Sequence, residues 1–232
     1  MENKIKTNAK TPWYSGNNRP IVLLDMDDVI TDCLKAVIAS YNEKYNTNFK
    51  PSQCNVWSLS EFFGTSIEDV LVLFRAEKFF EDLAPKRGSI KAIKDLVKST
   101  KYDIYVVTAT SDEDGSELQQ KIKWFNKYIP EFNTKRIISC QEKYIIRGDV
   151  IIDDKIENLD LCNPYMQCIL MDSPVNKTCD KYIRIKSLKE LPELLDKMFY
   201  ENDVKTFEKY YKQDLIKNTN TKLKDKYKNI NK

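Results

Sequence analysis

The sequence has 232 residues, of which 41% are hydrophobic and 31% are charged, and its formal net charge is +3. This length favours one domain, or one domain with an insert, and the composition excludes fibrous and disordered chains. The chain contains no histidine, which excludes Ser-His-Asp and Cys-His catalysis and HExxH zinc sites, so proton transfer must use Asp, Glu, Lys, Tyr or Cys.

Residues 1–19 are polar and predict an irregular arm, with Trp13 and Tyr14 packing back onto the rest of the protein. This arm lacks the apolar stretch of a secretory signal. No hydrophobic run in the sequence approaches the roughly 18 residues that a membrane span needs. We therefore expect a cytoplasmic protein with no membrane partner.

Six short apolar runs predict β-strands. Most of them are continuous and rich in β-branched residues, which is typical of strands buried on both faces of a parallel sheet. The predicted strands are Ile21–Asp25, Asp103–Thr108, Arg136–Cys140, Val150–Asp153, Gln167–Met171 and Tyr182–Ile185. Apolar residues recur at helical spacing between them, so the sequence predicts an α/β fold with a parallel sheet flanked by helices.

One connection is much longer than a single crossover requires. About 80 residues separate Asp25 from Asp103, whereas a crossover helix needs only about a dozen. Residues 34–45 have the spacing of an amphipathic helix, and a capping box formed by Thr65 and Glu68 is expected to begin another. The extra residues therefore predict a small helical cap inserted after the first strand.

These features divide the chain into four parts. The predicted parts are an arm at 1–19, an α/β core at 20–32 and 85–200, a helical cap at 33–84, and a C-terminal helix with a basic tail at 201–232. The C-terminal helix is marked by apolar residues at Val204, Phe207, Tyr211 and Leu215. The tail from Asp214 contains six Lys and two Asp. We interpret it as a solubilising end, because it has no arginine and no aromatic platform for nucleic acid.

The six cysteines are scattered along the sequence and include no CxxC pair. This pattern does not match a disulfide framework or a zinc site. We therefore expect six reduced thiols that fill core or surface positions.

Polar side chains gather where the predicted strands end, which is where open α/β folds bind ligands. The residues at these ends are Asp25, Asp27, Thr108, Lys143, Asp153 and Asp154. Each has a simpler explanation alone, such as a helix N-cap for an aspartate. Together, converging carboxylates favour a bound cation, and oxygen ligands without His or Cys favour Mg²⁺. A hydroxyl and a lysine suit phosphoryl oxygens, and an aspartate can form an aspartyl-phosphate.

This ordered set resembles the haloacid dehalogenase-like (HAD) phosphohydrolases and, more narrowly, the 5′(3′)-deoxyribonucleotidase family. Three runs carry the resemblance, namely LLDMDDVI at 23–30, FFEDLAPKRGSIKAIKDL at 79–96 and GDVIIDDK at 148–155. The similarity spans roughly residues 20–190. It implies a HAD-like Rossmannoid sheet with its cap after the first strand, and it is compatible with a homodimer.

The resemblance also implies roles for individual residues. Asp25 would be the nucleophile, and Asp27 the general acid and then the base. Mg²⁺ would be held by the Asp25 carboxylate, the Asp27 backbone carbonyl and an acidic residue of the Asp153–Asp154 pair. The residues expected at the phosphoryl group are Thr108, Ala109 and Lys143, and those expected to form a base pocket are Cys33, Trp57, Phe79 and Phe80. For the three aromatic residues, packing within the cap is the alternative.

The function predicted on this basis is Mg²⁺-dependent hydrolysis of (deoxy)nucleoside 5′(3′)-monophosphates. Another small phosphorylated metabolite is the alternative substrate. A nucleic-acid end is disfavoured because a cap of about 50 residues would cover the site, and a non-enzymatic binding module is disfavoured because every catalytic residue type is retained. Asp28 stands where the family has glycine, which adds a negative charge near the phosphate.

Overall fold

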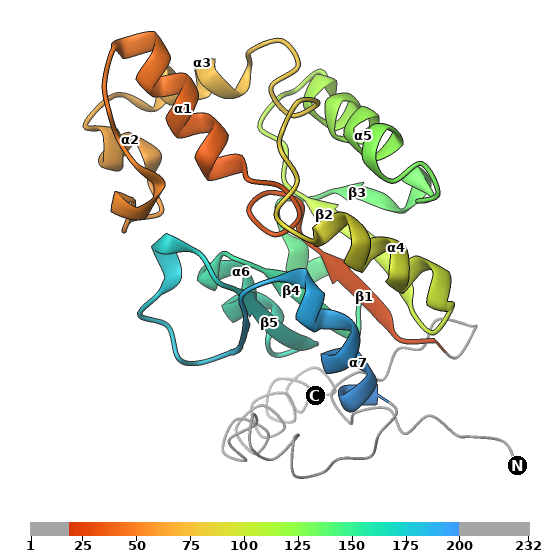
Figure 1. Ribbon diagram of the computed structural model, residues 1–232. Coiled ribbons are helices and arrows are strands. Elements are labelled where there is room, and N and C mark those ends of the chain that lie inside the picture. The colour runs from red at the N-terminus through yellow and green to blue at the C-terminus, as the bar shows by residue number, and fades with distance from the viewer. Residues whose placement is uncertain (1–18, 200–232) are drawn as a thin grey trace, which may run out of the picture.

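The computed structural model describes residues 19–199 of the chain (Figure 1). Almost all of the predicted N-terminal arm, including Trp13 and Tyr14, lies outside the described residues, as do the predicted C-terminal helix and basic tail at 201–232. Within the described range, none of the helices has the length and hydrophobicity of a membrane span. All six cysteines are free thiols.

The core is a six-stranded parallel sheet in the order β3-β2-β1-β4-β5-β6. Its strands are β1 (Ile21–Leu24), β2 (Asp103–Thr108), β3 (Ile137–Ser139), β4 (Val150–Asp153), β5 (Gln167–Met171) and β6 (Ile183–Ile185). The predicted α/β fold is confirmed. The bounds of β2, β4 and β5 are those predicted, and the other three strands are one or two residues shorter. Strand β1 pairs on both sides, with Leu24 opposite Val106 and Ile152.

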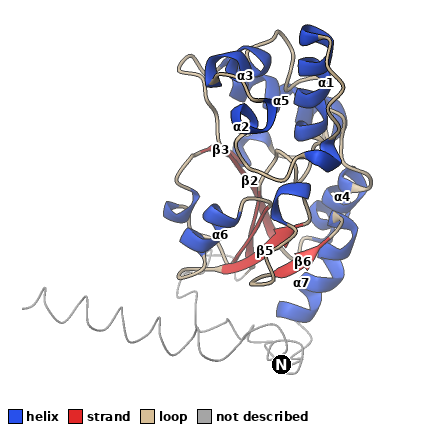
Figure 2. Ribbon diagram, turned by 90° about the vertical axis from the view of Figure 1, so that its left-hand side faces the viewer, coloured by secondary structure: helices blue, strands red, loops and turns tan. Residues whose placement is uncertain are grey.

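Alternate residues of each strand bury opposite faces of the sheet, as a period of two requires. Leu24 faces the larger core cluster, to which α4 (Ser89–Ser99), α5 (Ser116–Tyr128) and α7 (Leu191–Phe199) contribute. Leu23 faces the second cluster, which α6 (Ile156–Cys162) covers. Helices therefore cover both faces of the sheet (Figure 2), which explains why its strands are continuously apolar.

Three helices stand apart from the sheet, at the top of Figure 1. They are α1 (Cys33–Tyr45), α2 (Leu59–Phe63) and α3 (Ile67–Phe74), and they share a hydrophobic cluster of their own. At its centre the rings of Tyr41 and Phe63 stack, with their centroids 3.8 Å apart. The long connection after β1 thus contains helices that bury their apolar faces against one another.

The predicted capping box of Thr65 and Glu68 is wrong. The N-cap of α3 is Ser66, whose hydroxyl accepts a hydrogen bond from the backbone N–H of Asp69 at 3.2 Å. The hydroxyl of Thr65 donates instead to the Asp69 carboxylate at 2.7 Å. Either of the two adjacent hydroxyl residues could cap this helix, and Ser66 does so. Both hydroxyls also donate hydrogen bonds to the Asp69 carboxylate.

Candidate active site

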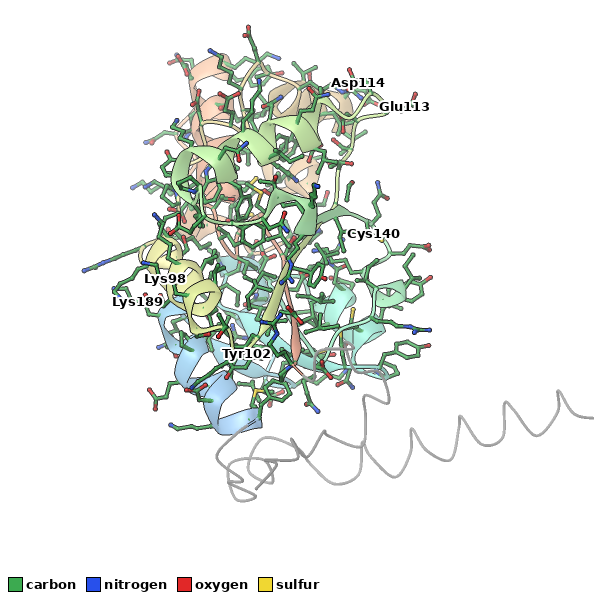
Figure 3. The ribbon with its side chains drawn as sticks, turned by 90° about the vertical axis from the view of Figure 1, so that its right-hand side faces the viewer. Lys98, Tyr102, Glu113, Asp114, Cys140 and Lys189 are labelled. Carbon is green, nitrogen blue, oxygen red and sulfur yellow. The ribbon has the colours of Figure 1, made fainter. Side chains whose placement is uncertain are left out.

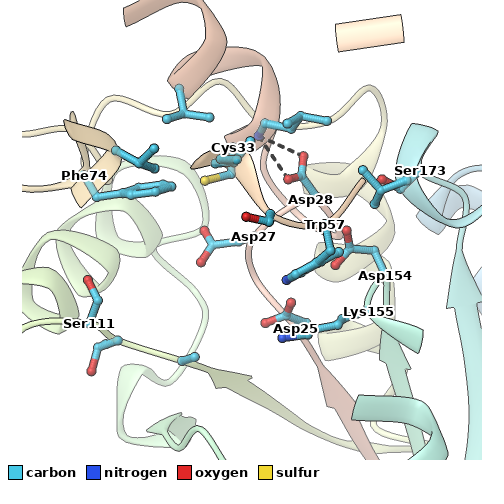
Figure 4. Close-up of a pocket in the computed structure, with 18 of the residues that line it drawn as sticks. Asp25, Asp27, Asp28, Cys33, Trp57, Phe74, Ser111, Asp154, Lys155 and Ser173 are labelled. Carbon is cyan, nitrogen blue, oxygen red and sulfur yellow. Dashed lines mark hydrogen bonds between the residues drawn. The ribbon is translucent and has the colours of Figure 1, made fainter. Parts of the chain in front are cut away.

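A cavity of about 590 Å³ lies between the three cap helices and the core. Its floor is made by segments that follow strands β1, β2 and β4, and Asp25, Asp27, Lys143 and Asp154 line it. Figure 4 shows these carboxylates beneath side chains that descend from the cap. The cavity therefore lies at the edge of the sheet where ligands of open α/β folds bind.

Asp25 and Lys143 form the centre of this floor. The backbone N–H of Asp25 bonds to the carbonyl of Ile152 at 2.9 Å, which continues the pairing of β1 with β4 and fixes the start of the loop. The Lys143 Nζ lies 2.7 Å from Asp25 Oδ1 and 2.7 Å from Asp153 Oδ2. Lys143 is almost fully buried. Its contacts hold the Asp25 carboxylate in one orientation.

Three buried carboxylates share this region with one lysine. One oxygen from each of Asp25, Asp153 and Asp154 lies within 4.8 Å of the others. Burial raises the pKa of Asp25 to about 7, against the opposing effect of Lys143. Burial also raises the pKa of Asp154 well above its ordinary value. Ionised carboxylates this close together repel one another, and a divalent cation would relieve that repulsion. Ligand atoms that are all oxygen suit Mg²⁺.

The two adjacent aspartates differ in what their carboxylates contact. Asp153 is fully buried and accepts hydrogen bonds from Lys143 at 2.7 Å, from the backbone N–H of Lys155 at 2.8 Å and from Asn158 at 3.1 Å. Asp154 instead lines the cavity. Asp154 is therefore the better placed of the pair to hold a cation, whereas Asp153 orients Lys143.

Lys121 of α5 is a site residue that the sequence analysis missed. Its side chain is fully buried, and its Nζ lies 2.8 Å from each of four oxygens, namely Asp27 Oδ2, Glu117 Oε1, Thr108 Oγ1 and the Ala109 carbonyl. Burial alone would lower the pKa of Lys121, but Asp27 and Glu117 outweigh it and raise the pKa. The sequence contained one signal for this residue, because Lys121 lies within the apolar stripe of the predicted helix and four residues after Glu117.

Thr108 does not reach the cavity. Its side chain is fully buried, and its hydroxyl accepts the hydrogen bond from Lys121. The cavity wall is made by the next three residues, Ala109, Thr110 and Ser111. The last residue of a strand can face only one side of the sheet, and this one faces α5.

Three of the four residues predicted for a base pocket line the cavity, namely Cys33, Trp57 and Phe80. Phe79 does not. Its ring packs edge-on against Phe74 at 5.3 Å and against Phe80 at 5.0 Å between centroids. Phe74 lines the cavity in its place. Adjacent residues of the turn direct their side chains differently, so only one of the two predicted phenylalanines reaches the wall.

Two aromatic rings on the cavity wall contact lysines of the core. The Lys121 Nζ lies 4.5 Å from the centroid of the Phe80 ring, and the Lys155 Nζ lies 5.0 Å from that of Trp57. Trp57 is 45% exposed, so its ring is only partly covered in the protein. Figure 4 shows Trp57 close to Asp154 and Lys155, on the far side of Asp27 from Phe74.

Asp28 occupies the position where the family that this sequence resembles has glycine. Its φ of 56° lies in the left-handed region, which aspartate tolerates better than most residues. Its carboxylate accepts hydrogen bonds from the backbone N–H of Leu34 at 3.0 and 3.1 Å, drawn as dashed lines in Figure 4. Asp28 therefore stabilises the start of α1, whose own N-cap residue Asp32 makes no such bond.

Comparison with known proteins agrees with this geometry. The family model described as 5′ nucleotidase, deoxy (Pyrimidine), cytosolic type C protein matches residues 19–199. The chain is 28% identical over 177 residues to the 5′(3′)-deoxyribonucleotidase of Bacillus subtilis, covering 76% of this chain and 99% of the relative. It is 25% identical over 185 residues to the 5′(3′)-deoxyribonucleotidase of Clostridium acetobutylicum, covering 78% and 97%.

A solved haloacid dehalogenase-like family hydrolase from Streptococcus pneumoniae shares the fold, with a TM-score of 0.51 at 14% identity over 76% of this chain and 98% of that one. The sequence motifs, the parallel sheet and the match along 19–199 thus indicate the same family. The chain belongs to the family of 5′ nucleotidases, deoxy (pyrimidine), cytosolic type C, which are phosphoric monoester hydrolases, and its fold is HAD-like.

Proposed function

We propose that this protein is a Mg²⁺-dependent phosphatase that releases phosphate from (deoxy)nucleoside 5′(3′)-monophosphates. The observation that carries the proposal is the buried cluster of Asp25, Lys143 and Asp154 on the floor of a cavity that the cap covers. The names of the relatives from Bacillus subtilis and Clostridium acetobutylicum support the substrate class.

Asp25 and Asp154 are the carboxylates that fit Mg²⁺, with the backbone carbonyl of Asp27 added by the resemblance. Both carboxylates line the cavity, and all donors are oxygens. Bound Mg²⁺ would supply positive charge to phosphoryl oxygens and offset the repulsion among the aspartates. Lys143, whose Nζ lies 2.7 Å from Asp25 Oδ1, supplies a second positive charge.

The reaction proceeds through Asp25 and Asp27. The Asp25 carboxylate attacks phosphorus, the bond to the ester oxygen breaks, and Asp27 gives that oxygen a proton. Asp27 then takes a proton from the water that hydrolyses the aspartyl-phosphate. The Lys121 contact occupies Asp27 Oδ2, whereas Oδ1 has no hydrogen-bond partner within residues 19–199. Lys121 is thus a positioning residue that holds the Asp27 carboxylate in one orientation.

The cap supplies the surface for the nucleobase. Trp57 and Phe74 present aromatic rings to the cavity, and aromatic faces accept any base without strict hydrogen-bond readout. The phosphate end of the substrate lies by Lys143 and the segment Ala109–Ser111. This arrangement supports binding of a mononucleotide along the cavity, with its base towards the cap.

The test is phosphate release from deoxy- and ribonucleoside 5′- and 3′-monophosphates, with Mg²⁺ and with EDTA. We expect metal-dependent release that favours deoxynucleotides. Asp25→Asn should lower the rate by about 10⁴-fold or more, the scale seen when an enzyme loses its nucleophile. Asp95→Asn, an exposed carboxylate on α4, is the matched control and should keep full activity.

The outcomes separate the parts of the proposal. Release only from phosphoesters that are not nucleotides would retain Asp25 as nucleophile and reject the base pocket. Activity that persists in EDTA would reject the Mg²⁺ site. Full activity of Asp25→Asn would reject the aspartyl-phosphate.

A further inference from the structure

A second cavity, of about 460 Å³, lies beside the first at the carboxyl ends of β5 and β6. Met171, the last residue of β5, and Lys186, the residue after β6, both line it. Its charged lining residues are Asp32, Lys86, Arg87, Lys186 and Lys189. The proposed phosphatase reaction uses none of these residues.

Three of these cations have no counterion among the residues that the structure describes. Within residues 19–199 no ion pair involves Arg87, Lys186 or Lys189, and Lys86 makes only long contacts, 3.9 Å to Asp28 and 3.8 Å to Asp32. Positive charges gathered around a hollow without counterions attract an anion, and phosphate groups bind Arg and Lys through charge-assisted hydrogen bonds. The cavity is far larger than one phosphate ion, so it suits a chain of phosphates.

One of these lysines packs against the backbone beside the cavity. The Lys189 side chain lies against Gly88, where a Cβ would come within 2.2 Å of the Lys189 Cε. Figure 3 shows Lys189 beside α4. Gly88 also has a φ of +87°, so its backbone conformation favours glycine, and the missing Cβ leaves room for the Lys189 side chain.

The cavity adjoins the two segments that join the cap to the core. These segments run side by side, because the N–H of Asp32 bonds to the Ala84 carbonyl at 2.9 Å and that of Lys86 bonds to the Ile30 carbonyl at 2.9 Å. Lys86 and Arg87 belong to the second segment, whereas Lys186 and Lys189 belong to the core. An anion that bound all four residues would therefore hold the segment that connects the cap against the core.

We propose that this cavity, defined by Lys86, Arg87, Lys186 and Lys189, binds the polyphosphate group of a small anion and that binding lowers turnover. A tied connection restrains the opening of the cap, which release of product requires. Lys86 links the two cavities, since it also contacts Asp28 of the first. The effect on turnover rests on the proposed function, but the binding does not.

Calorimetric titration tests the binding. Tripolyphosphate and a deoxynucleoside triphosphate are titrated separately in EDTA, which distinguishes recognition of the phosphate chain from recognition of a nucleotide. We expect Lys186→Ala with Lys189→Ala to weaken binding by about tenfold or more, because two charge-assisted contacts are lost. Lys35→Ala with Lys135→Ala removes the same charge at exposed sites outside the cavity and should not weaken it.

Equal binding by the wild type and the Lys186/Lys189 variant would overturn the proposal, and so would equal weakening in both double variants. Hydrolysis of p-nitrophenyl phosphate at constant free Mg²⁺ tests the second part. Tripolyphosphate should lower the kcat of the wild type and leave that of the Lys186/Lys189 variant unchanged. Binding without a fall in kcat would overturn the regulatory role. A protein with no phosphatase activity would contradict the proposed function and leave the binding result valid.

Discussion

Lys121 Nζ and Asp27 Oδ2 lie 2.8 Å apart, although the two residues are 94 positions apart in the sequence. The contact joins α5 to the loop after β1, and Glu117 on the same helix shares the ammonium at 2.8 Å. Glu117 in turn accepts a hydrogen bond from the backbone N–H of Ser111 at 2.8 Å. One buried lysine therefore fixes both the proposed acid and the loop that follows β2.

Lys121→Met should impair proton transfer to the leaving group. General acid catalysis contributes about 10²–10⁴-fold, so we expect kcat for a nucleotide to fall about 10²-fold or more and kcat for p-nitrophenyl phosphate to fall less than about tenfold. The difference arises because p-nitrophenolate leaves without a proton. The measurement is the ratio of the two kcat values, which partial unfolding does not change.

Lys123→Met is the matched control on the same helix. Lys123 is exposed and pairs with Glu81 at 3.4 Å, so both kcat values should stay at the wild-type level. An equal loss for both substrates in Lys121→Met would show that Lys121 does not act through protonation of the leaving group. Losing the lysine leaves two carboxylates without their partner, so thermal unfolding should be recorded for each variant.

Trp57→Ala should weaken nucleotide binding selectively. Stacking of a base on an aromatic ring is worth about 1–3 kcal/mol, so the KM for a nucleotide should rise about tenfold while that for p-nitrophenyl phosphate changes little. Tyr165→Ala is the control, because Tyr165 is similarly exposed at 49% and lies outside the cavity. Equal KM values in Trp57→Ala and the wild type would exclude base stacking on this residue.

Phe74 and Phe79 should differ although both are half-buried aromatic residues of one cluster. Phe74 lines the cavity, whereas Phe79 packs behind it. Phe74→Ala should therefore raise the KM for a nucleotide and lower the melting temperature, and Phe79→Ala should lower the melting temperature with an unchanged KM. A larger KM effect in Phe79→Ala would restore Phe79 to the base pocket.

The buried carboxylates predict an unusual pH dependence for the metal-free protein. Burial raises the pKa of Asp25 from 3.8 to about 7, so between these values the folded state keeps a proton that the unfolded state has lost. The corresponding contribution to the free energy of unfolding is present below about pH 4 and is lost as the pH rises through about 7. The pKa of Asp154 is raised as well, which adds a change of the same sign.

Urea denaturation in EDTA at pH 5 and pH 8 checks this dependence. The midpoint should fall at the higher pH, and Mg²⁺ should restore it more at pH 8 than at pH 5. Asp25→Asn removes the titrating group and should reduce the pH dependence. A midpoint that fell equally in the wild type and in Asp25→Asn would assign the effect to other groups.

Much of the fold followed from local sequence. The apolar runs at 103–108 and 150–153 consist mostly of β-branched residues that a doubly covered strand buries, so their bounds could be read directly. Asp25 and Asp27 follow β1, and Asp153 and Asp154 stand at the end of β4. Parallel strands bring their carboxyl ends together. The cap followed from the length of one connection. The choice between Ser66 and Thr65 as the N-cap did not follow, because both have a hydroxyl and the local sequence does not fix which of them accepts the hydrogen bond from the Asp69 N–H.

The sequence by itself determined the sheet, the presence of helices in the long connection after β1 and the carboxylates at the strand ends, because periodicity and strand ends are local properties. Tertiary structure alone decided that Lys121 reaches Asp27, that Thr108 faces this lysine, and that Phe74 lines the cavity while Phe79 does not. Those outcomes depend on which side chains meet across elements far apart in the chain. Burial adds a further condition, because a charged lysine is stable in the interior only when carboxylates lie close to it.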